Sequence, residues 1–184
     1  MADRERQRRF EALLREHQRI IFKVAGVYAR NVSDRDDLAQ DIATQMWRSF
    51  ASFDERRAKF STWMYRVALN VAISHVRTGA RRDAARSQPL ESADFEAVAD
   101  SGVTQFERIE SDERSAALHA FIGSLDPLNR ALVLLYLEER SYAEIAEVLG
   151  VSETNVATKL NRIKQKLRGQ MAAQQPAGAR NGTR

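Results

Sequence analysis

The sequence predicts an all-α protein made of two small helical domains joined by a flexible acidic linker. Apolar residues recur every three or four positions on both sides of the middle of the chain, and no segment alternates with period two for long enough to indicate a strand. Only 8 Gly and 3 Pro occur in 184 residues, as expected of helices joined by short turns. The predicted boundaries are 1–82 for the first domain, 83–112 for the linker, 113–169 for the second domain and 170–184 for a disordered tail.

Three helices are expected in the first domain, a small bundle. The second begins near Ser33 or Asp34, either of which can cap it, and the third begins near Ser61. The apolar face of the first helix is Phe10, Leu13, Leu14, His17, Ile21, Val24 and Tyr28. That of the second is Leu38, Ile42, Met46 and Phe50, and that of the third is Phe60, Trp63, Met64, Val67, Val71 and either Ile73 or His75.

The middle of the chain has the composition of a linker. Residues 83–113 hold nine acidic and two basic side chains, with Pro89, Gly102 and few large apolar residues. A structureless loop of this length is uncommon inside a compact domain, so a boundary between domains is the better interpretation.

The second domain is marked by local helix signals. Asp126-Pro127 is typical of a cap followed by the first helical residue, and Ser141 with Glu144 matches the capping box. Gly150 suits a left-handed helix end, and Ser152 can cap the helix after it. The apolar positions are Leu118, Phe121, Ile122 and Leu125 in a short helix, Leu128, Leu132, Leu135 and Tyr136 in the next, then Tyr142, Ile145, Ala146 and Leu149, and finally Val156, Leu160, Ile163 and Leu167.

The last two of these helices have the spacing of a helix-turn-helix. Ala146 is small where the helices would cross, Gly150 makes the turn, and Val156 anchors the second helix. A polar and basic outer face then remains, which suits the major groove of DNA. Its residues are Ser152, Thr154, Asn155, Thr158, Lys159, Arg162 and Lys166. The alternative is a helical hairpin with a solvated basic face and no DNA partner.

The formal net charge of +4 conceals separate blocks of charge. Residues 56–82 carry seven basic and no acidic side chains, and residues 152–184 carry seven basic and one acidic. In the first block basic residues alternate with aromatic ones, a combination that suits unpaired nucleic acid. The aromatic residues can equally be core, and for Trp63 that interpretation is the stronger one.

No pattern indicates catalysis, a cofactor or a metal. The chain has no Cys, and its three histidines, His17, His75 and His119, lie far apart in the sequence. No phosphate-binding or dinucleotide-binding glycine motif is present. A charged N-terminus and the lack of a long apolar segment predict a cytoplasmic protein without a membrane span.

Two segments and their order resemble a known family. Region 2.2 of extracytoplasmic-function (ECF) RNA polymerase sigma factors is similar to Asp36-Asp37-Leu38-Ala39-Gln40-Asp41 through Met46-Trp47-Arg48 and Phe53-Asp54. Region 2.3 of that family is similar to Phe60 to Asn70, and region 4 is similar to Leu125-Asp126-Pro127 with the helix-turn-helix. The resemblance implies a subunit that binds core polymerase at the β′ clamp helices and the β flap. It also implies recognition of the minus-thirty-five element in duplex DNA, melting of the minus-ten element to single strands, and an anti-sigma partner.

Carried over by position, the resemblance assigns three sets of residues. Core-polymerase contact falls on Asp37, Gln40, Asp41, Gln45, Trp47 and Arg48. Minus-ten contact falls on Arg56, Arg57, Lys59, Phe60, Ser61, Trp63, Tyr65, Arg66, Asn70 and Arg77. The candidate base-capture region is the loop 54–61 together with Asn70. Minus-thirty-five contact falls on the outer face of the helix-turn-helix given above. Ser74 and Thr158-Lys159 depart from the residues common in the family, which bears on promoter preference.

Two other functions remain alternatives at this point. One is a stand-alone helix-turn-helix regulator that does not engage polymerase, and the other is an adaptor that does not bind DNA. The acidic segment followed by the basic, aromatic segment at 33–82 favours the sigma factor, because a repressor needs neither.

Overall fold

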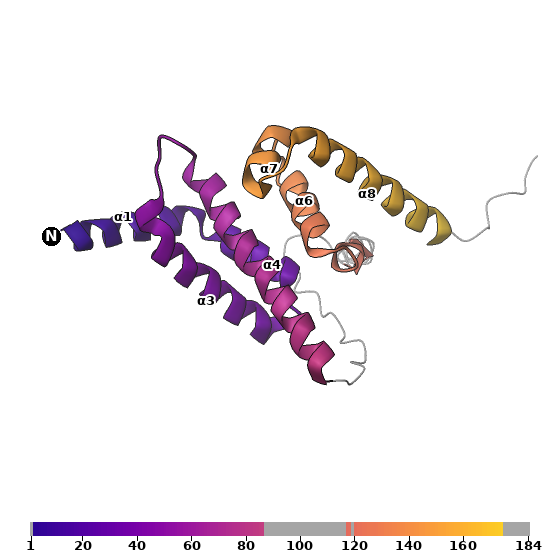
Figure 1. Cartoon of the computed structure of the whole chain (residues 1–184), viewed down its shortest axis with the longest axis horizontal. Coiled ribbons are helices and arrows are strands. Elements are labelled where there is room, and N and C mark those ends of the chain that lie inside the picture. The colour runs from indigo at the N-terminus through magenta and orange to yellow at the C-terminus, as the bar shows by residue number, and fades with distance from the viewer. Residues whose placement is uncertain (1, 87–116, 119, 175–184) are drawn as a thin grey trace, which may run out of the picture.

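The computed structural model describes residues 2–86, 117–118 and 120–174, and the regular secondary structure within these ranges is helical. Before the linker lie α1 (Ala2–His17), α2 (Arg19–Tyr28), α3 (Val32–Ser49), a short 3₁₀ helix η1 (Phe50–Ser52) and α4 (Phe60–Arg86). After it lie α6 (Pro127–Leu137), α7 (Tyr142–Leu149) and α8 (Glu153–Gln174), preceded by helical residues at 117–118 and 120–123 (Figure 1). The all-α prediction is confirmed.

The first predicted helix is in fact two. The chain breaks at Gln18, whose carbonyl accepts a hydrogen bond from the Ile21 N–H at 3.0 Å, a tighter turn than that of an α-helix. The apolar spacing continues across the break, so periodicity did not reveal it. The next helix is capped by Asn31 and neither Ser33 nor Asp34, because the Asn31 side chain accepts from the Asp34 N–H at 2.9 Å.

Two helices extend past the boundaries expected from the sequence. Helix α4 continues to Arg86, four residues into the expected linker, and α8 continues to Gln174, so residues 170–174 of the expected disordered tail are helical. Both extensions are rich in Ala, Arg and Gln, which favour helix without an apolar period. The rest of the predicted linker, and the tail from 175, lie outside the described residues.

Local caps in the second half match the sequence signals. Asp126 caps α6 with Pro127 at its start, Ser141 and Glu144 form the complete capping box of α7, and Gly150 ends α7 with φ of 68°. The Ser152 hydroxyl accepts from the Asn155 N–H at 3.2 Å. These contacts place α7 and α8 in the helix-turn-helix arrangement.

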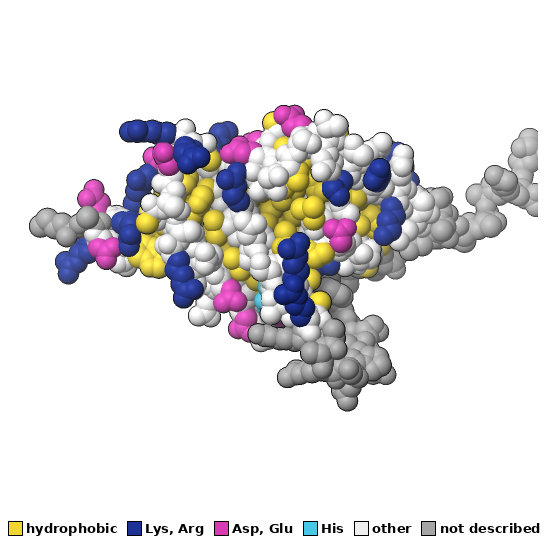
Figure 2. Space-filling view, in the orientation of Figure 1, with side chains coloured by type: hydrophobic (Ala, Val, Ile, Leu, Met, Phe, Trp, Pro, Cys, Tyr) yellow, Lys and Arg dark blue, Asp and Glu magenta, His cyan; other side chains and the backbone are white. Residues whose placement is uncertain are grey.

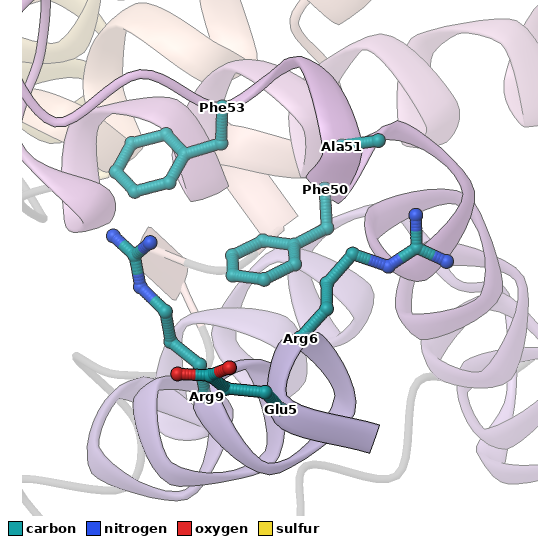
Figure 3. A pocket seen from close by; sticks show the side chains of 6 residues that line it. All are labelled: Glu5, Arg6, Arg9, Phe50, Ala51 and Phe53. Carbon is teal, nitrogen blue, oxygen red and sulfur yellow. The ribbon is translucent and has the colours of Figure 1, made fainter. Parts of the chain in front are cut away.

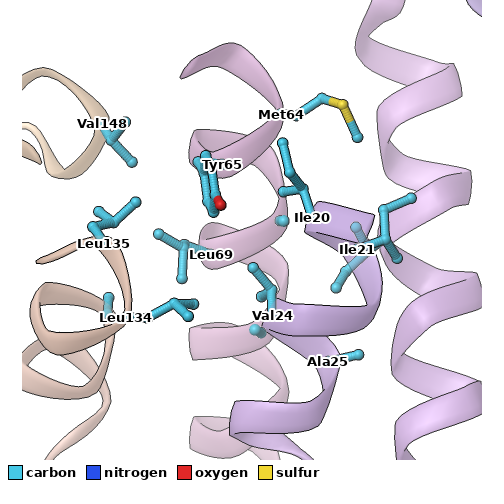
Figure 4. Close-up of a cluster of buried hydrophobic side chains, with 14 of the residues drawn as sticks. Ile20, Ile21, Val24, Ala25, Met64, Tyr65, Leu69, Leu134, Leu135 and Val148 are labelled. Atoms are coloured by element: carbon cyan, nitrogen blue, oxygen red, sulfur yellow. The ribbon is translucent and has the colours of Figure 1, made fainter. Parts of the chain in front are cut away.

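The main core lies where α2, α3 and α4 pack together, and α6 and α7 pack against α2 and α4. Figure 4 shows Leu134, Leu135 and Val148 of the second half facing Tyr65 and Leu69 of the first. One continuous buried cluster therefore spans both predicted domains. A second, smaller cluster contains Phe121, Ile122, Leu125, Val133 and Ile163.

A polar contact joins the start of α3 to the middle of α4. The His75 Nε2 and Asp34 Oδ1 atoms are 2.9 Å apart, and the Asp34 side chain also accepts from the Arg30 N–H at 2.8 Å. Burial alone would raise the pKa of Asp34, but these hydrogen bonds and the charges of His75 and Arg30 outweigh it and hold the pKa below its ordinary value. The ionised form of Asp34 therefore stabilises the fold.

Replacing Asp34 with Asn is expected to destabilise the chain by about 1.5–3 kcal/mol at pH 7, the size of a lost hydrogen bond to a charged group. Because the folded pKa is depressed, this contribution is present above the unfolded pKa of about 3.9 and is lost as pH falls through the folded pKa. Urea unfolding at pH 7 and at pH 2.5 to 3 measures the free energy of unfolding of both proteins. The difference between wild type and Asp34→Asn should disappear at the acid pH. Asp36→Asn, an exposed neighbour, is the matched control; an equal effect at both pH values would contradict the account.

Candidate nucleic-acid interface

Helix α3 presents a row of polar side chains to solvent. Leu38, Ile42 and Met46 are fully buried, which turns the opposite side of the helix outward. All six residues predicted for polymerase contact are exposed: Asp37, Gln40, Asp41, Gln45, Trp47 and Arg48. We call these six residues the docking face.

Trp47 has a structural role beside any role in binding. Its ring lies 5.3 Å from that of Phe10, between centroids, and the Arg6 guanidinium lies 5.2 Å from the Trp47 ring. Trp47 thus holds α1 against α3 while remaining 36% exposed. Replacing Trp47 would therefore disturb the packing of α1 on α3, whereas Asp41 is exposed and its replacement would change only the surface.

An aromatic cluster supports the segment between η1 and α4. It consists of Phe50, Phe53, Phe60 and Trp63, and the centroids of Phe53, Phe60 and Trp63 lie 5.2 to 5.3 Å from one another. Between Phe53 and Phe60 of this cluster the chain forms the basic loop, residues 54–59. The Asp54 side chain accepts a hydrogen bond from the Arg56 N–H at 2.9 Å, and the Asp54 backbone carbonyl accepts one from the Arg57 N–H at 3.0 Å. The loop is therefore a defined turn on a rigid support.

A hollow of about 290 Å³ opens beside the basic loop. Its walls include Phe53 and Trp63 from the aromatic cluster and the cationic side chains of Arg57 and Arg66. The remaining lining residues are Ser52, Asp54, Ala58 and, from α7, Glu147. Aromatic rings beside guanidinium groups can stack an unpaired base and bind its phosphate.

A second hollow, of about 320 Å³, lies between α1 and η1 and is lined by Glu5, Arg6, Arg9, Phe50, Ala51 and Phe53 (Figure 3). Arg9 of α1 extends toward Phe53 there, whereas the Arg6 side chain passes beside Phe50 and its guanidinium lies 5.2 Å from the centroid of the Trp47 ring. Arg9 forms an ion pair with Glu55 of the basic loop, and Arg6 is hydrogen-bonded to Asp3. This side therefore braces the loop against α1.

The residues predicted for minus-ten contact divide into surface and core. Arg56, Arg57, Lys59, Arg66, Asn70 and Arg77 are exposed, and Ser61 and Trp63 are half-buried. Phe60 and Tyr65 are buried, Phe60 within the aromatic cluster and Tyr65 beneath α6 and α7, so in this conformation neither reaches the surface. Trp63 is part of the core and of the surface, because its ring packs in the aromatic cluster and also lines the hollow.

Helix α8 carries the predicted minus-thirty-five residues on one side, which we call the reading face. Ser152, Thr154, Asn155, Thr158, Arg162 and Lys166 are exposed, and Lys159 is half-buried. Two hydroxyls are already used, since Ser152 caps the helix and Thr158 Oγ1 donates to the Thr154 carbonyl at 2.8 Å. Val156, Leu160 and Ile163 are buried on the other side. The Thr154 hydroxyl, the Asn155 amide and the basic groups are thus left for contact.

Sequence reasoning missed the residues of α6 and α7 that meet the first half of the chain. Glu138 binds Lys23 and Tyr65, and Glu147 lines the hollow beside the basic loop. These partners are separated by more than seventy sequence positions, and no local pattern could have linked them.

Charged side chains of both signs lie on the surface. Figure 2 shows Lys and Arg side chains spread along one face, with Asp and Glu side chains and hydrophobic side chains between them. Among the residues that the structure describes there is no group of three or more potential metal ligands. Within the same residues, no helix combines the length and the apolar character that crossing a membrane requires.

Comparison with known families gives two matches in this chain. Residues 13–82 match sigma-70 region 2, and residues 115–167 match sigma-70 region 4. The first match contains the docking face and the basic loop, and the second contains the helix-turn-helix.

Similar proteins agree with these matches. The chain is 31% identical over 153 residues to the ECF RNA polymerase sigma factor SigW of Bacillus subtilis, covering 77% of each chain. Among solved structures, it is similar in fold to CnrH in complex with the cytosolic domain of CnrY, with a TM-score of 0.62, 23% identity and coverage of 92% and 91% of the two chains. It is also similar in fold to the sigma factor RpoE in complex with the anti-sigma factor NepR from Bartonella quintana, with a TM-score of 0.70, 16% identity and coverage of 90% and 98%.

Proposed function

The chain belongs to the ECF family of sigma factors, which direct RNA polymerase to promoters, and we propose that it does so through three separate surfaces. The docking face of α3 binds core polymerase, the basic loop with its hollow holds the melted minus-ten strand, and the reading face of α8 binds the minus-thirty-five element. The family is not enzymatic, so these surfaces act by binding alone. The match to region 2 argues against a stand-alone regulator.

The observation that carries the proposal is the hollow beside the basic loop. Extruding a base from duplex DNA costs a few kcal/mol of lost stacking, which the protein must return in contacts. Phe53 and Trp63 supply ring faces, and Arg57 and Arg66 supply charge, within one hollow of about 290 Å³. A helix-turn-helix alone has no use for such a hollow.

Partners and compartment follow from the same assignment. Core polymerase, through the β′ clamp helices and the β flap, and promoter DNA are the proposed partners, and the cytoplasm is the proposed compartment. An anti-sigma factor is a further proposed partner, because the solved relatives are complexes with CnrY and with NepR.

The proposed function is tested by footprinting on a genomic promoter fragment. Core polymerase with the chain should protect two blocks of DNA, one upstream and one around the start site, whereas core polymerase alone should protect neither. A chain that binds core polymerase but yields no protection on any genomic promoter would contradict the proposal.

The reading face gives a separate prediction. Arg162→Ala should weaken binding to a promoter duplex and make the slope of log K against log salt shallower by about one unit, because one fewer counterion is released. Lys164→Ala is the matched control on the same helix, since the Lys164 Nζ lies 4.0 Å from the centroid of the Tyr136 ring, away from the reading face. Fluorescence anisotropy across a salt series measures the affinity and its salt slope for each protein. Equal slopes for wild type and Arg162→Ala would contradict phosphate contact by Arg162.

A further inference from the structure

The hollow between α1 and η1, which we call the α1 hollow, repeats the chemistry of the hollow beside the basic loop. Its volume is about 320 Å³, against about 290 Å³ beside the basic loop, and the Phe53 ring lines both. Each hollow has one further aromatic ring, Phe50 in the α1 hollow and Trp63 beside the basic loop, and each is lined by two arginines. Two hollows of the same composition therefore meet at one ring.

Arg9 supplies the cationic side of the α1 hollow. Figure 3 shows its guanidinium extending from α1 toward the Phe53 ring, with the Phe50 ring beside it. The Arg6 guanidinium is placed instead over the Trp47 ring, 5.2 Å from its centroid, so Arg9 is the arginine whose charge faces the two phenylalanines. An aromatic ring and a guanidinium across one hollow can stack an unpaired base and bind its phosphate.

The ion pair between Arg9 and Glu55 is compatible with this role. The side chains of Arg9 and Glu55 are 55% and 59% exposed, and ion pairs with this much solvent contact contribute little to stability. A phosphate oxygen forms a strong hydrogen bond with a guanidinium and can therefore replace the Glu55 carboxylate. The exchange leaves the turn of the basic loop in place, because that turn is held by hydrogen bonds to Asp54.

An acidic residue in the wall favours a nucleotide over a free anion. Glu5 lines the α1 hollow, where its carboxylate would repel a bare phosphate but can accept a hydrogen bond from an amino group on a base edge. The Phe50 and Phe53 rings are nearly parallel, with centroids 6.1 Å apart, and Phe50 is buried in the core. Fixed rings, a guanidinium and a carboxylate thus suit the face, the phosphate and the edge of one nucleotide.

The α1 part of the hollow precedes the segment that matches region 2. That match begins at residue 13, whereas Glu5, Arg6 and Arg9 lie before it. Phe10 fixes this part of α1 to the fold, since its ring centroid lies 5.3 Å from that of Trp47 and 5.1 Å from that of Phe50. The α1 hollow is therefore built jointly by region 2 and by helical turns that precede it.

We propose that the α1 hollow is a second subsite for unpaired DNA, which takes another nucleotide of the strand held beside the basic loop. Arg9 exchanges Glu55 for the phosphate of that nucleotide, and the base packs against Phe50 and Phe53. This inference rests on the proposed function of the basic loop. Successive bases of a single strand stack on aromatic rings while cationic groups follow the backbone, so two hollows that share a ring suit one continuous strand.

Photocrosslinking locates the nucleotide at each hollow. The chain has no Cys, so Ala51→Cys in the α1 hollow and Ala58→Cys beside the basic loop can each be labelled with azidophenacyl bromide before core polymerase is added. Open complexes on a genomic promoter fragment are then irradiated, and the crosslinked nucleotides are mapped by primer extension. The two labels should reach different nucleotides of the same unpaired strand. Ala12→Cys, exposed on α1 and outside both hollows, is the matched control and should reach none.

Two substitutions in the Arg9–Glu55 pair separate binding of DNA from bracing of the loop. Arg9→Ala should lower the yield of open complexes about tenfold, the effect of one lost hydrogen bond to a charged group. It should also make the slope of log K against log salt shallower by about 0.7, the value for one phosphate of a single strand. Glu55→Gln breaks the same ion pair but releases Arg9, so its yield should equal or exceed that of the wild type. Arg8→Ala removes an exposed neighbouring charge outside both hollows and is the matched control.

Permanganate reactivity across a salt series measures the yield, and the outcomes separate this inference from the function on which it rests. If the label at position 58 crosslinks the unpaired strand and the label at 51 does not, or if both map to one nucleotide, the second subsite is overturned and the function of the basic loop stands. Equal losses for Arg9→Ala and Glu55→Gln would show that the pair only braces the loop and would likewise overturn the subsite. If neither label reaches an unpaired nucleotide, the proposed function of the basic loop fails together with the inference.

Discussion

Replacing Asp41 with Lys is expected to weaken binding to core polymerase by about 100-fold or more. Asp41 lies in the middle of the docking face, exposed, while its neighbours Leu38 and Ile42 on the same helix are fully buried. Reversing a charge at an interface places like charges together, which costs several kcal/mol. Fluorescence titration of labelled chain with core polymerase measures the loss.

The design of that experiment separates docking from folding. Glu11→Lys makes the same change of charge on α1, where Glu11 is exposed and accepts a surface hydrogen bond from Gln7. It should bind core polymerase as the wild type does, and both variants should unfold at the wild-type urea concentration. Trp47→Ala should also impair binding but lower stability, because Trp47 packs on Phe10. Wild-type affinity for Asp41→Lys would show that α3 is not the docking surface.

Removing both arginines at the tip of the basic loop is expected to block promoter opening. Arg56 and Arg57 are exposed, and their backbone N–H groups donate to Asp54, hydrogen bonds that substitution by Ala leaves in place. A hydrogen bond to a charged group contributes about 1.5–3 kcal/mol, so Arg56→Ala/Arg57→Ala should reduce open complexes about 100-fold. Permanganate reactivity of unpaired thymines reports the open complexes.

Binding to core polymerase should be unchanged in this variant, since the docking face is intact. Arg15→Ala/Arg19→Ala removes the same two charges from exposed positions on α1 and α2 and should open promoters normally. If the loop variant melts promoters as well as this control does, the basic loop does not hold the single strand.

The features that the sequence predicted correctly depend on neighbouring residues. Asp126-Pro127, the Ser141–Glu144 box and Gly150 each act within a few positions, and all three occur as expected. Apolar spacing likewise located the buried side of α3, because Leu38, Ile42 and Met46 follow the helical repeat. Exposure of the docking face and of most of the reading face then follows from the helical repeat.

The features that could not be predicted depend on tertiary contact. Nothing near Tyr65 in the sequence indicates that Glu138 binds its hydroxyl, and nothing near Glu147 indicates that it lines the hollow beside Arg57. The alternation of basic and aromatic residues also could not separate Phe60, which is buried, from Trp63, which reaches the hollow. Charge patterns locate a surface, whereas burial decides which of its residues a ligand can reach.

Run-off transcription with purified core polymerase tests the central claim most directly. Genomic promoter fragments are transcribed with core polymerase alone, with the wild-type chain added, and with Asp41→Lys or Arg56→Ala/Arg57→Ala added in its place. If the chain initiates transcription through these surfaces, discrete promoter-dependent transcripts form with the wild type only and are lost with either variant. Absence of stimulation by the wild type on every fragment, with no association between the chain and core polymerase, would contradict it.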